Sequence, residues 1–275
     1  MHILVHLVLV CVTVVALYPV LWVVKMALTP SQSFAVGISP FPDQVSGDNF
    51  AGVVGNSALD GTWVFGHQLA NSFFVSIATA IVGLLLSVLA AYALARFKFP
   101  GRRLSLSAML LTQMFPGTLM MVPLYAILDR LNLLDQLGGL VLVYATTSVP
   151  FSTWMLKGYF DTLPKDLEEA ALLDGASRGQ ILWKIIMPLA RPGMAVTGLF
   201  SFMTAWNEYI MAAKFMNKET SYTLPVVLAQ YVGAKSTAWG SFAAGAILVS
   251  IPVMILFFAL QRHLVGGLTA GAVKG

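Results

Sequence analysis

One acidic residue stands out because it lies inside an apolar stretch. Glu208, preceded by Asn207, is the only charged residue between positions 193 and 213. A helix entered at residue 193 would carry this carboxylate to a depth of about 22 Å. A charge there is costly unless it faces the interior of a helix bundle, a wet cavity or a partner group. Asn207 and Glu208 therefore either line a transport route or gate, or form hydrogen bonds between helices.

A second unusual feature is a proline-glycine pair inside another apolar stretch. Pro116 and Pro123 each lack a backbone N–H, and Gly117 follows the first of them. Gln113 adds a polar side chain close by. We expect a kink at this point, since such breaks are tolerated in membrane helices where neighbouring groups satisfy the freed backbone. Gln113 and Pro116 either line a transport pathway or mark an irregularity in helix packing.

The remaining reactive residues form no catalytic or metal-binding set. No phosphate-binding Walker A motif is present, and no nucleophile has a base at a readable spacing. His2 and His6 are four residues apart, but no further ligand lies near them in the sequence. The chain is therefore predicted to be no enzyme and to bind no metal or cofactor. Energy for any transport must come from another polypeptide or from an ion gradient.

The elements that position these residues follow from composition. Of the 275 residues, 58% are hydrophobic and 10% are charged, which excludes a soluble globular domain. A bilayer core needs about 20 apolar residues for each crossing helix. We predict one all-α membrane domain over residues 1–275, a bundle of six transmembrane helices. The six spans are expected at about residues 3–28, 69–95, 104–128, 136–156, 193–214 and 239–261.

The basic residues indicate the orientation of these spans. Six crossings divide the 16 Lys and Arg residues into eleven on one side and five on the other. By the positive-inside tendency, both termini and the loop over residues 157–191 are cytoplasmic. The loop over 215–238 is then external, and residues 262–275 form a cytoplasmic tail. No basic stretch is interleaved with aromatic residues, so no nucleic-acid partner is expected.

The cytoplasmic loop 157–191 is predicted to contain two short helices. The first has helical spacing of apolar residues, with Lys165, Glu168 and Glu169 largely on the opposite side. Its apolar face comprises Leu163, Leu167, Ala170 and Ala171. Pro164 suits the start of this helix and Gly175 its end.

The second helix should begin at Ser177. Gln180 follows three residues later and completes a capping box, in which each side chain bonds the other residue's backbone N–H. Pro188 and Pro192 should end this helix before the next span. A helix–turn–helix of this kind outside the membrane is a rigid element that another protein could hold, although a simple solvated hairpin has the same pattern.

The loop resembles the EAA loop of ABC importer permeases. The shared residues are Glu169-Ala170-Ala171, Gly175, Ile185 and Pro188, with Met187 in place of the usual leucine. The resemblance implies the type I ABC importer permease architecture, in which this loop forms a coupling helix that fits a cleft of a cytoplasmic ATPase. It assigns ATPase coupling to Glu169, Ala170, Ala171, Asp174 and Gly175.

Further segments resemble the MalG-type permeases of maltose and maltodextrin importers. They are residues 90–97, 99–101, 113–116 and 267–275. The resemblance implies three kinds of companion besides the lipid bilayer: a second permease of MalF type, two copies of a MalK-type ATPase that uses ATP and Mg, and an extracytoplasmic sugar-binding protein. It also implies that residues 217–239 approach the binding protein, and that the tail touches the ATPase pair. The tail residues concerned are Gly271, Ala272, Val273, Lys274 and Gly275.

The expected function is that of a non-catalytic permease subunit in the bacterial cytoplasmic (inner) membrane. It would move maltose or maltodextrin-type oligosaccharides by alternating access. Two alternatives stay open at this point. One is the same importer architecture for another substrate, such as trehalose, lactose or glycerol phosphate. The other is an ion-coupled secondary transporter in which Glu208 is the ion site.

Overall fold

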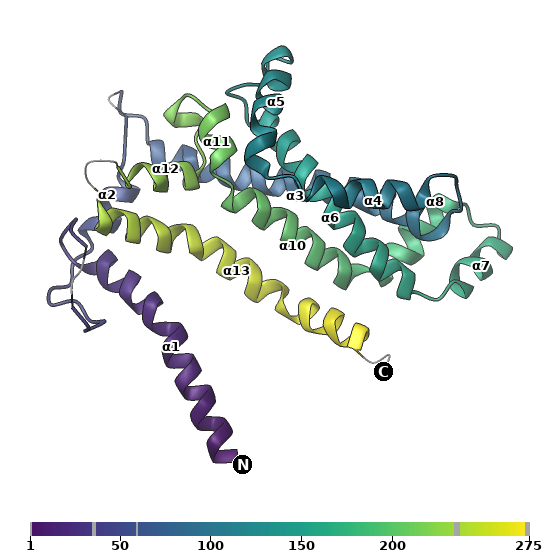
Figure 1. Cartoon of the computed structure of the whole chain (residues 1–275), viewed down its shortest axis with the longest axis horizontal. Coiled ribbons are helices and arrows are strands. Elements are labelled where there is room, and N and C mark those ends of the chain that lie inside the picture. Colours follow the sequence, from purple (N-terminus) through teal and green to yellow (C-terminus); the bar gives the residue numbers. More distant parts are fainter. Residues whose placement is uncertain (1, 35–36, 59, 234–236, 273–275) are drawn as a thin grey trace. The chain divides into compact units, whose positions relative to one another are not determined.

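The computed structural model describes residues 2–34, 37–58, 60–233 and 237–272. The described chain is built of helices, and it divides into two compact units (Figure 1). One unit comprises Met1–Ala70 with Tyr222–Val253, and the other comprises Asn71–Ser221 with Met254–Gly275. Two long helices, α3 (Val64–Arg96) and α13 (Trp239–Ala272), each contribute to both units.

The long helices match the membrane spans expected from composition. Among the described residues, four helices have the length and hydropathy to cross a bilayer, and two bent helix pairs raise the number to six if each pair is one span. The four are α1 (His2–Leu28), α3, α6 (Leu137–Thr162) and α13. The prediction of an all-α membrane protein is therefore confirmed for the described residues.

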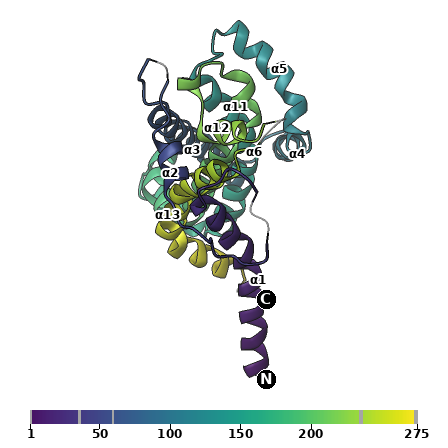
Figure 2. The ribbon, with the colours of Figure 1, turned by 90° about the vertical axis from the view of Figure 1, so that its left-hand side faces the viewer.

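The first bent pair lies where the sequence predicts a kink. Helix α4 (Arg102–Thr112) and helix α5 (Gly117–Arg130) meet at 100°. Pro116 is the residue before α5 and offers no N–H to continue α4. Figures 1 and 2 both show α5 leaving the end of α4 at a sharp angle. We call this bend the α4–α5 elbow.

The fifth predicted span is not one continuous helix. Helix α10 (Arg191–Asn207) stops at Asn207, and the chain resumes as α11 (Ile210–Phe215). The prediction of a single helix over residues 193–214 is therefore wrong. The cause is Glu208, whose extended backbone ends α10 and whose carboxylate bonds the first turn of α11.

The unit that contains α1 is organised around one buried amide. Asn49, on α2 (Asp48–Val54), donates its Nδ2 hydrogens to the carbonyl oxygens of Ala27 at 3.1 Å and Thr29 at 2.8 Å. These oxygens lie at the end of α1, where the helix supplies no donor of its own. Residues 3–21 of α1 are all exposed and mostly apolar, which suits a helix that faces lipid or another chain.

The other unit has a core of small residues between helices. A side chain at Gly83 of α3 would lie 3.1 Å from Ser148 Oγ of α6 and 3.3 Å from Ser201 Oγ of α10. The hydroxyls of Ser152 and Ser201 are 3.1 Å apart. Small residues allow membrane helices to approach closely. Nearer the loop 157–191, an apolar cluster that includes Tyr92, Phe160 and Ile181 joins the same helices to the loop.

Candidate functional site

A helix forms in the first half of the loop and ends at the predicted glycine, but Leu167 and Ala170 of its predicted apolar face are exposed. Helix α7 (Asp166–Leu173) is followed by Gly175 with φ +81°. Side chains other than glycine strain in this left-handed conformation. The N–H of Ala176 donates to the carbonyl of Ala171 at 2.9 Å, which closes the helix end. The turn after α7 therefore has a fixed shape.

The second helix starts with the predicted capping box. Ser177 Oγ accepts the N–H of Gln180 at 3.3 Å, and Gln180 Oε1 accepts the N–H of Ser177 at 2.8 Å. The helix comprises α8 (Arg178–Ile181), a wider π-helical turn (Leu182–Ile186) and α9 (Met187–Leu189). The helix was expected to end at Pro188, but it includes this residue and ends at Leu189. The wider turn before the proline accommodates its missing N–H.

Most of the predicted coupling residues lie on the surface. Glu169, Ala170, Asp174 and Gly175 are exposed, whereas Ala171 packs into the apolar cluster. Leu173, an apolar residue, is also on the surface and is 90% exposed. The exposed residues of α7 and its turn are Asp166, Leu167, Glu169, Ala170, Leu172, Leu173, Asp174 and Gly175. We call them the docking surface because the family resemblance predicts that an ATPase binds here. The exposed leucines among these residues are compatible with contact with another protein, which stays a prediction.

Glu168 does not lie on the exposed side of α7, where the periodicity places it. The residue is only 3% exposed, and its carboxylate forms an ion pair with Arg96 at the end of α3. The predicted side of Glu168 is wrong because the partner charge comes from a residue 72 positions earlier. The only sequence signal was an arginine placed directly after a long uncharged stretch.

Glu208 forms a joint between α10 and α11. Its carboxylate accepts the N–H groups of Met211 at 2.8 Å and Ala212 at 3.1 Å, and the hydroxyl of Tyr144 donates to it at 2.6 Å. The carboxylate thus satisfies donors at the start of α11. Asn207 is exposed. This geometry supplies the hydrogen-bonded role for Glu208, while a pathway role for Asn207 and Glu208 stays a prediction.

A cavity of about 610 Å³ lies at the α4–α5 elbow. Gln113 lines it and donates from Nε2 to the carbonyl of Thr147 at 3.1 Å. Pro116, the residue directly before α5, lies at the elbow itself. The polar side chains of the lining come from α4 and α6 and are Thr112, Gln113, Thr146 and Thr147. The elbow thus combines a bent segment with a cavity that has some polar groups in its lining, while a pathway role for Gln113 and Pro116 stays a prediction.

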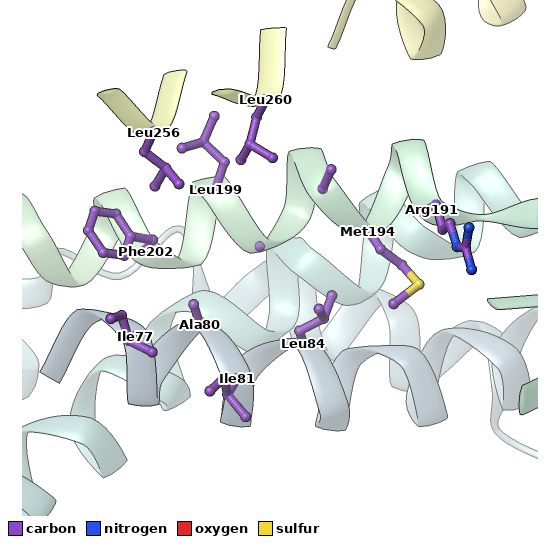
Figure 3. Close-up of a pocket in the computed structure, with 12 residues that line it drawn as sticks. Ile77, Ala80, Ile81, Leu84, Arg191, Met194, Leu199, Phe202, Leu256 and Leu260 are labelled. Atoms are coloured by element: carbon purple, nitrogen blue, oxygen red, sulfur yellow. The ribbon is translucent and has the colours of Figure 1, made fainter. Parts of the chain in front are cut away.

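A second hollow, of about 410 Å³, lies between α3, α10 and the second half of α13 (Figure 3). Its lining is apolar except for Arg191, whose side chain lies at one end next to Met194. A ligand rich in hydroxyl groups needs convergent polar partners. The lining of this second hollow offers no such set of polar side chains.

The structure describes two of the five predicted tail residues. Val273, Lys274 and Gly275 lie outside the described residues, while Gly271 and Ala272 are in the last turn of α13. Among the described residues, no group of three or more His, Cys, Asp or Glu side chains could hold a metal ion.

Membrane helices, an exposed helix–turn–helix and a cavity at a broken span are the features expected of a membrane component that works with another protein. Residues 83–269 match the family of binding-protein-dependent transport system inner membrane components. The chain belongs to this family. It is a non-catalytic, multi-pass permease subunit of the inner membrane, as the sequence predicts.

Relatives match almost the whole chain. The maltose/maltodextrin transport system permease protein MalG of Escherichia coli (strain K12) is 38% identical over 98% of this chain and 95% of its own length. The trehalose transport system permease protein SugB of Mycobacterium tuberculosis (strain CDC 1551 / Oshkosh) is 37% identical over 94% of this chain and 93% of its own length. These likenesses confirm the MalG-type resemblance.

A solved structure shares the fold. A chain of a bacterial ABC transporter that imports the acidic polysaccharide alginate superimposes with a TM-score of 0.79 and 25% identity, covering 96% of each chain. A chain of the MetNI methionine ABC transporter gives a TM-score of 0.59 at 19% identity, over 74% of this chain and 93% of its own. The architecture is that of an ABC importer permease, as expected.

Proposed function

We propose that this chain is the permease subunit of an ATP-driven importer of maltose and maltodextrin-type oligosaccharides. The MalG relatives, alike over nearly the full chain, support this substrate class. The trehalose relative is almost as similar and favours trehalose as the second candidate. All of these sugars are built from glucose, so the two proposals differ in linkage and chain length and not in the chemistry of the sugar unit.

The proposed partners follow from the docking surface. An ATPase would bind the exposed residues around Ala170 and Gly175, the observation that carries the proposal. A MalF-type permease, two MalK-type ATPases and an extracytoplasmic sugar-binding protein would complete the importer. ATP and Mg would be bound by the ATPases. The termini and the docking surface would be cytoplasmic, and closure of the ATPase pair would shift the permease between its two access states.

The docking proposal is tested by Ala170→Lys. Ala170 is exposed in the middle of α7, so a lysine there leaves the helix intact but places bulk and charge on the docking surface. We expect sugar uptake by the assembled importer to fall about tenfold. Ala51→Lys, on the exposed side of the short helix α2, is the matched control and should leave uptake unchanged. Wild-type uptake in Ala170→Lys would contradict docking at α7.

The substrate proposal is tested on the cognate binding protein. Calorimetric titration with maltose, maltotriose and trehalose should give tight binding for the first two. Tight binding of trehalose alone would favour the second candidate. A separate experiment addresses the energy source: uptake driven by an ion gradient into vesicles that contain only this chain would instead indicate a secondary transporter.

A further inference from the structure

The only charged residue of α7 that is buried is held by the last turn of α3. Arg96 Nε donates to Glu168 Oε1, and the hydroxyl of Tyr92 donates to Glu168 Oε2 at 3.1 Å. Tyr92 and Arg96 are four residues apart and therefore lie on one face of α3. Both carboxylate oxygens of Glu168 are thus bound by the same helix. We call Tyr92, Arg96 and Glu168 the α3–α7 link.

Arg96 of this link also binds the end of α6. Arg96 Nη2 donates to the carbonyl of Leu163 at 3.3 Å, and Leu163 is the residue that ends α6. The side chains of Arg96 and Glu168 are 5% and 4% exposed, so water screens their attraction little. The guanidinium is planar, and two of its nitrogens bind acceptors on different elements, which sets both distance and direction. The ends of α3 and α6 and the start of α7 are therefore fixed relative to one another.

Few other contacts tie α7 to the helices beneath it. Within Asp166–Leu173 only Glu168 and Ala171 are buried. The methyl group of Ala171 packs in the apolar cluster without directional preference. An ion pair with hydrogen bonds resists sliding, whereas an apolar contact allows it. A force applied to the docking surface therefore reaches α3 chiefly through Glu168.

Helix α3 is suited to carry such a displacement onward. The part of α3 from Asn71 to Arg96 contains no proline, and this part is about 39 Å long at 1.5 Å per residue. A second contact secures the same end, since the guanidinium of Arg178 on α8 lies 5.8 Å from the ring centre of Phe97. The ring of Phe97 in turn packs edge-on against Tyr92.

We propose that the α3–α7 link transmits movement of the docking surface into α3, so that Arg96 and Glu168 are positioning residues for coupling ATP hydrolysis to transport. The inference rests on ATPase docking at α7, as proposed above. It predicts that loss of the link separates the two activities: the ATPases still dock and hydrolyse ATP, but the membrane helices no longer follow.

The decisive variant removes both charges together. Arg96→Met with Glu168→Leu replaces the ion pair by apolar side chains, which avoids leaving one buried charge unpaired. The complete importer is reconstituted in vesicles, and ATP hydrolysis, sugar uptake and subunit composition are measured on the same preparation. We expect an assembled complex whose uptake per ATP hydrolysed falls about tenfold. A wild-type ratio in the assembled double variant would overturn the inference.

Two further variants keep the test decisive. If the double variant does not assemble, Glu168→Asp, one methylene shorter, must lower uptake per ATP in an assembled complex, and a wild-type ratio there overturns the inference. Asp161→Asn is the matched control. It removes the partly exposed ion pair with Lys157 near the same end of α6 and should change neither activity nor assembly.

The parallel variant Ala170→Lys distinguishes this inference from the proposed function. Normal uptake in Ala170→Lys would count against docking at α7. Reduced uptake in Ala170→Lys together with a wild-type ratio in the double variant would reject the link alone.

Discussion

The loop beside α3 and the joint between α10 and α11 each contain a carboxylate that accepts a hydrogen bond from a tyrosine. Tyr92 donates to Glu168, and Tyr144 donates to Glu208. The remaining partners differ. Glu168 is paired with the full positive charge of Arg96, whereas Glu208 accepts two backbone N–H groups three and four residues ahead.

This difference separates two uses of a carboxylate. Backbone N–H groups at a helix start carry partial positive charge and belong to the adjacent residues. Glu208 therefore shapes the chain locally, as a helix cap does. Glu168 needs a counter-charge from another helix and thereby joins two elements that are far apart in the sequence. Substitutions that keep an acceptor oxygen but remove the charge distinguish the two.

The largest effect is expected for Glu168→Gln. The glutamine leaves the buried Arg96 guanidinium without a counter-charge, and breaking a buried pair in this way costs about 3–5 kcal/mol. Thermal unfolding of the purified importer should shift to clearly lower temperature. Asp161→Asn, which breaks a partly exposed pair, should leave the unfolding midpoint close to wild type. Equal midpoints for the two variants would contradict the role assigned to the link.

The same exchange at Glu208 should be tolerated. Glutamine keeps an oxygen that can accept from the N–H groups of α11, so Glu208→Gln should cost less than about 1 kcal/mol. Glu208→Ala removes every acceptor and leaves the buried Tyr144 hydroxyl without this partner, with an expected cost of about 1–3 kcal/mol. Thermal unfolding checks both.

Uptake measured on the Glu208 variants addresses the open pathway role. Normal transport per assembled complex in both would assign Glu208 to structure alone. Loss of transport in Glu208→Gln with intact stability would instead favour a place in the pathway.

Local signals in the sequence were sufficient for several features of the site. Gly175 ends α7, and Ser177 and Gln180 form the capping box, because these patterns involve residues within one or two turns. The break near Pro116 follows from the missing N–H of proline. The membrane spans follow from composition, since bilayer thickness sets their length.

Features that depend on distant partners could not be read in this way. Tyr144 precedes Glu208 by 64 residues, and Arg96 precedes Glu168 by 72. Periodicity places a charged residue toward water by default, so it put Glu168 on the wrong side of α7. The hydrogen bonds of Glu208 to the start of α11 are local. However, the presence of a polar residue within an apolar stretch does not by itself indicate whether that residue faces a pathway or caps a helix.

A smaller effect on stability than for Glu168→Gln is expected at Gly175. Its variants test whether the docking surface beside the α3–α7 link contacts the ATPase. Gly175→Ala places a Cβ in a residue with φ +81°, with no other atom within 4 Å, so its cost is conformational, about 1–2 kcal/mol. Gly175→Asn should cost less, because asparagine adopts this conformation more readily. Thermal unfolding should rank the two in that order. If uptake falls equally in both although their stabilities differ, contact with the ATPase explains the loss, and not backbone strain.

The smallest effect should come from a third carboxylate, which lies between α5 and α6. Asp135 Oδ1 accepts the N–H groups of Asn217 at 3.1 Å and Lys218 at 3.4 Å. Burial raises the pKa of Asp135, but these hydrogen bonds and the charge of Lys218 outweigh it and hold the pKa below its usual value. The ionised form is therefore the one that the fold stabilises.

Because the folded pKa is lowered, this stabilisation is complete above the unfolded value of about 3.9 and is lost as the pH falls through the folded value. The amides of Asn217 and Lys218 should keep their protection from hydrogen exchange down to about pH 4 and lose it at lower pH, after correction for intrinsic rates. Asp135→Asn keeps an acceptor oxygen and should remove this pH dependence at a cost below about 1 kcal/mol. Asp60→Asn is the control, since Asp60 bonds Thr62 within its own turn. Protection that falls equally in wild type and Asp135→Asn would show that another group controls the pH dependence at Asn217 and Lys218. Only Glu168 and Glu208 would then remain in the comparison of carboxylates.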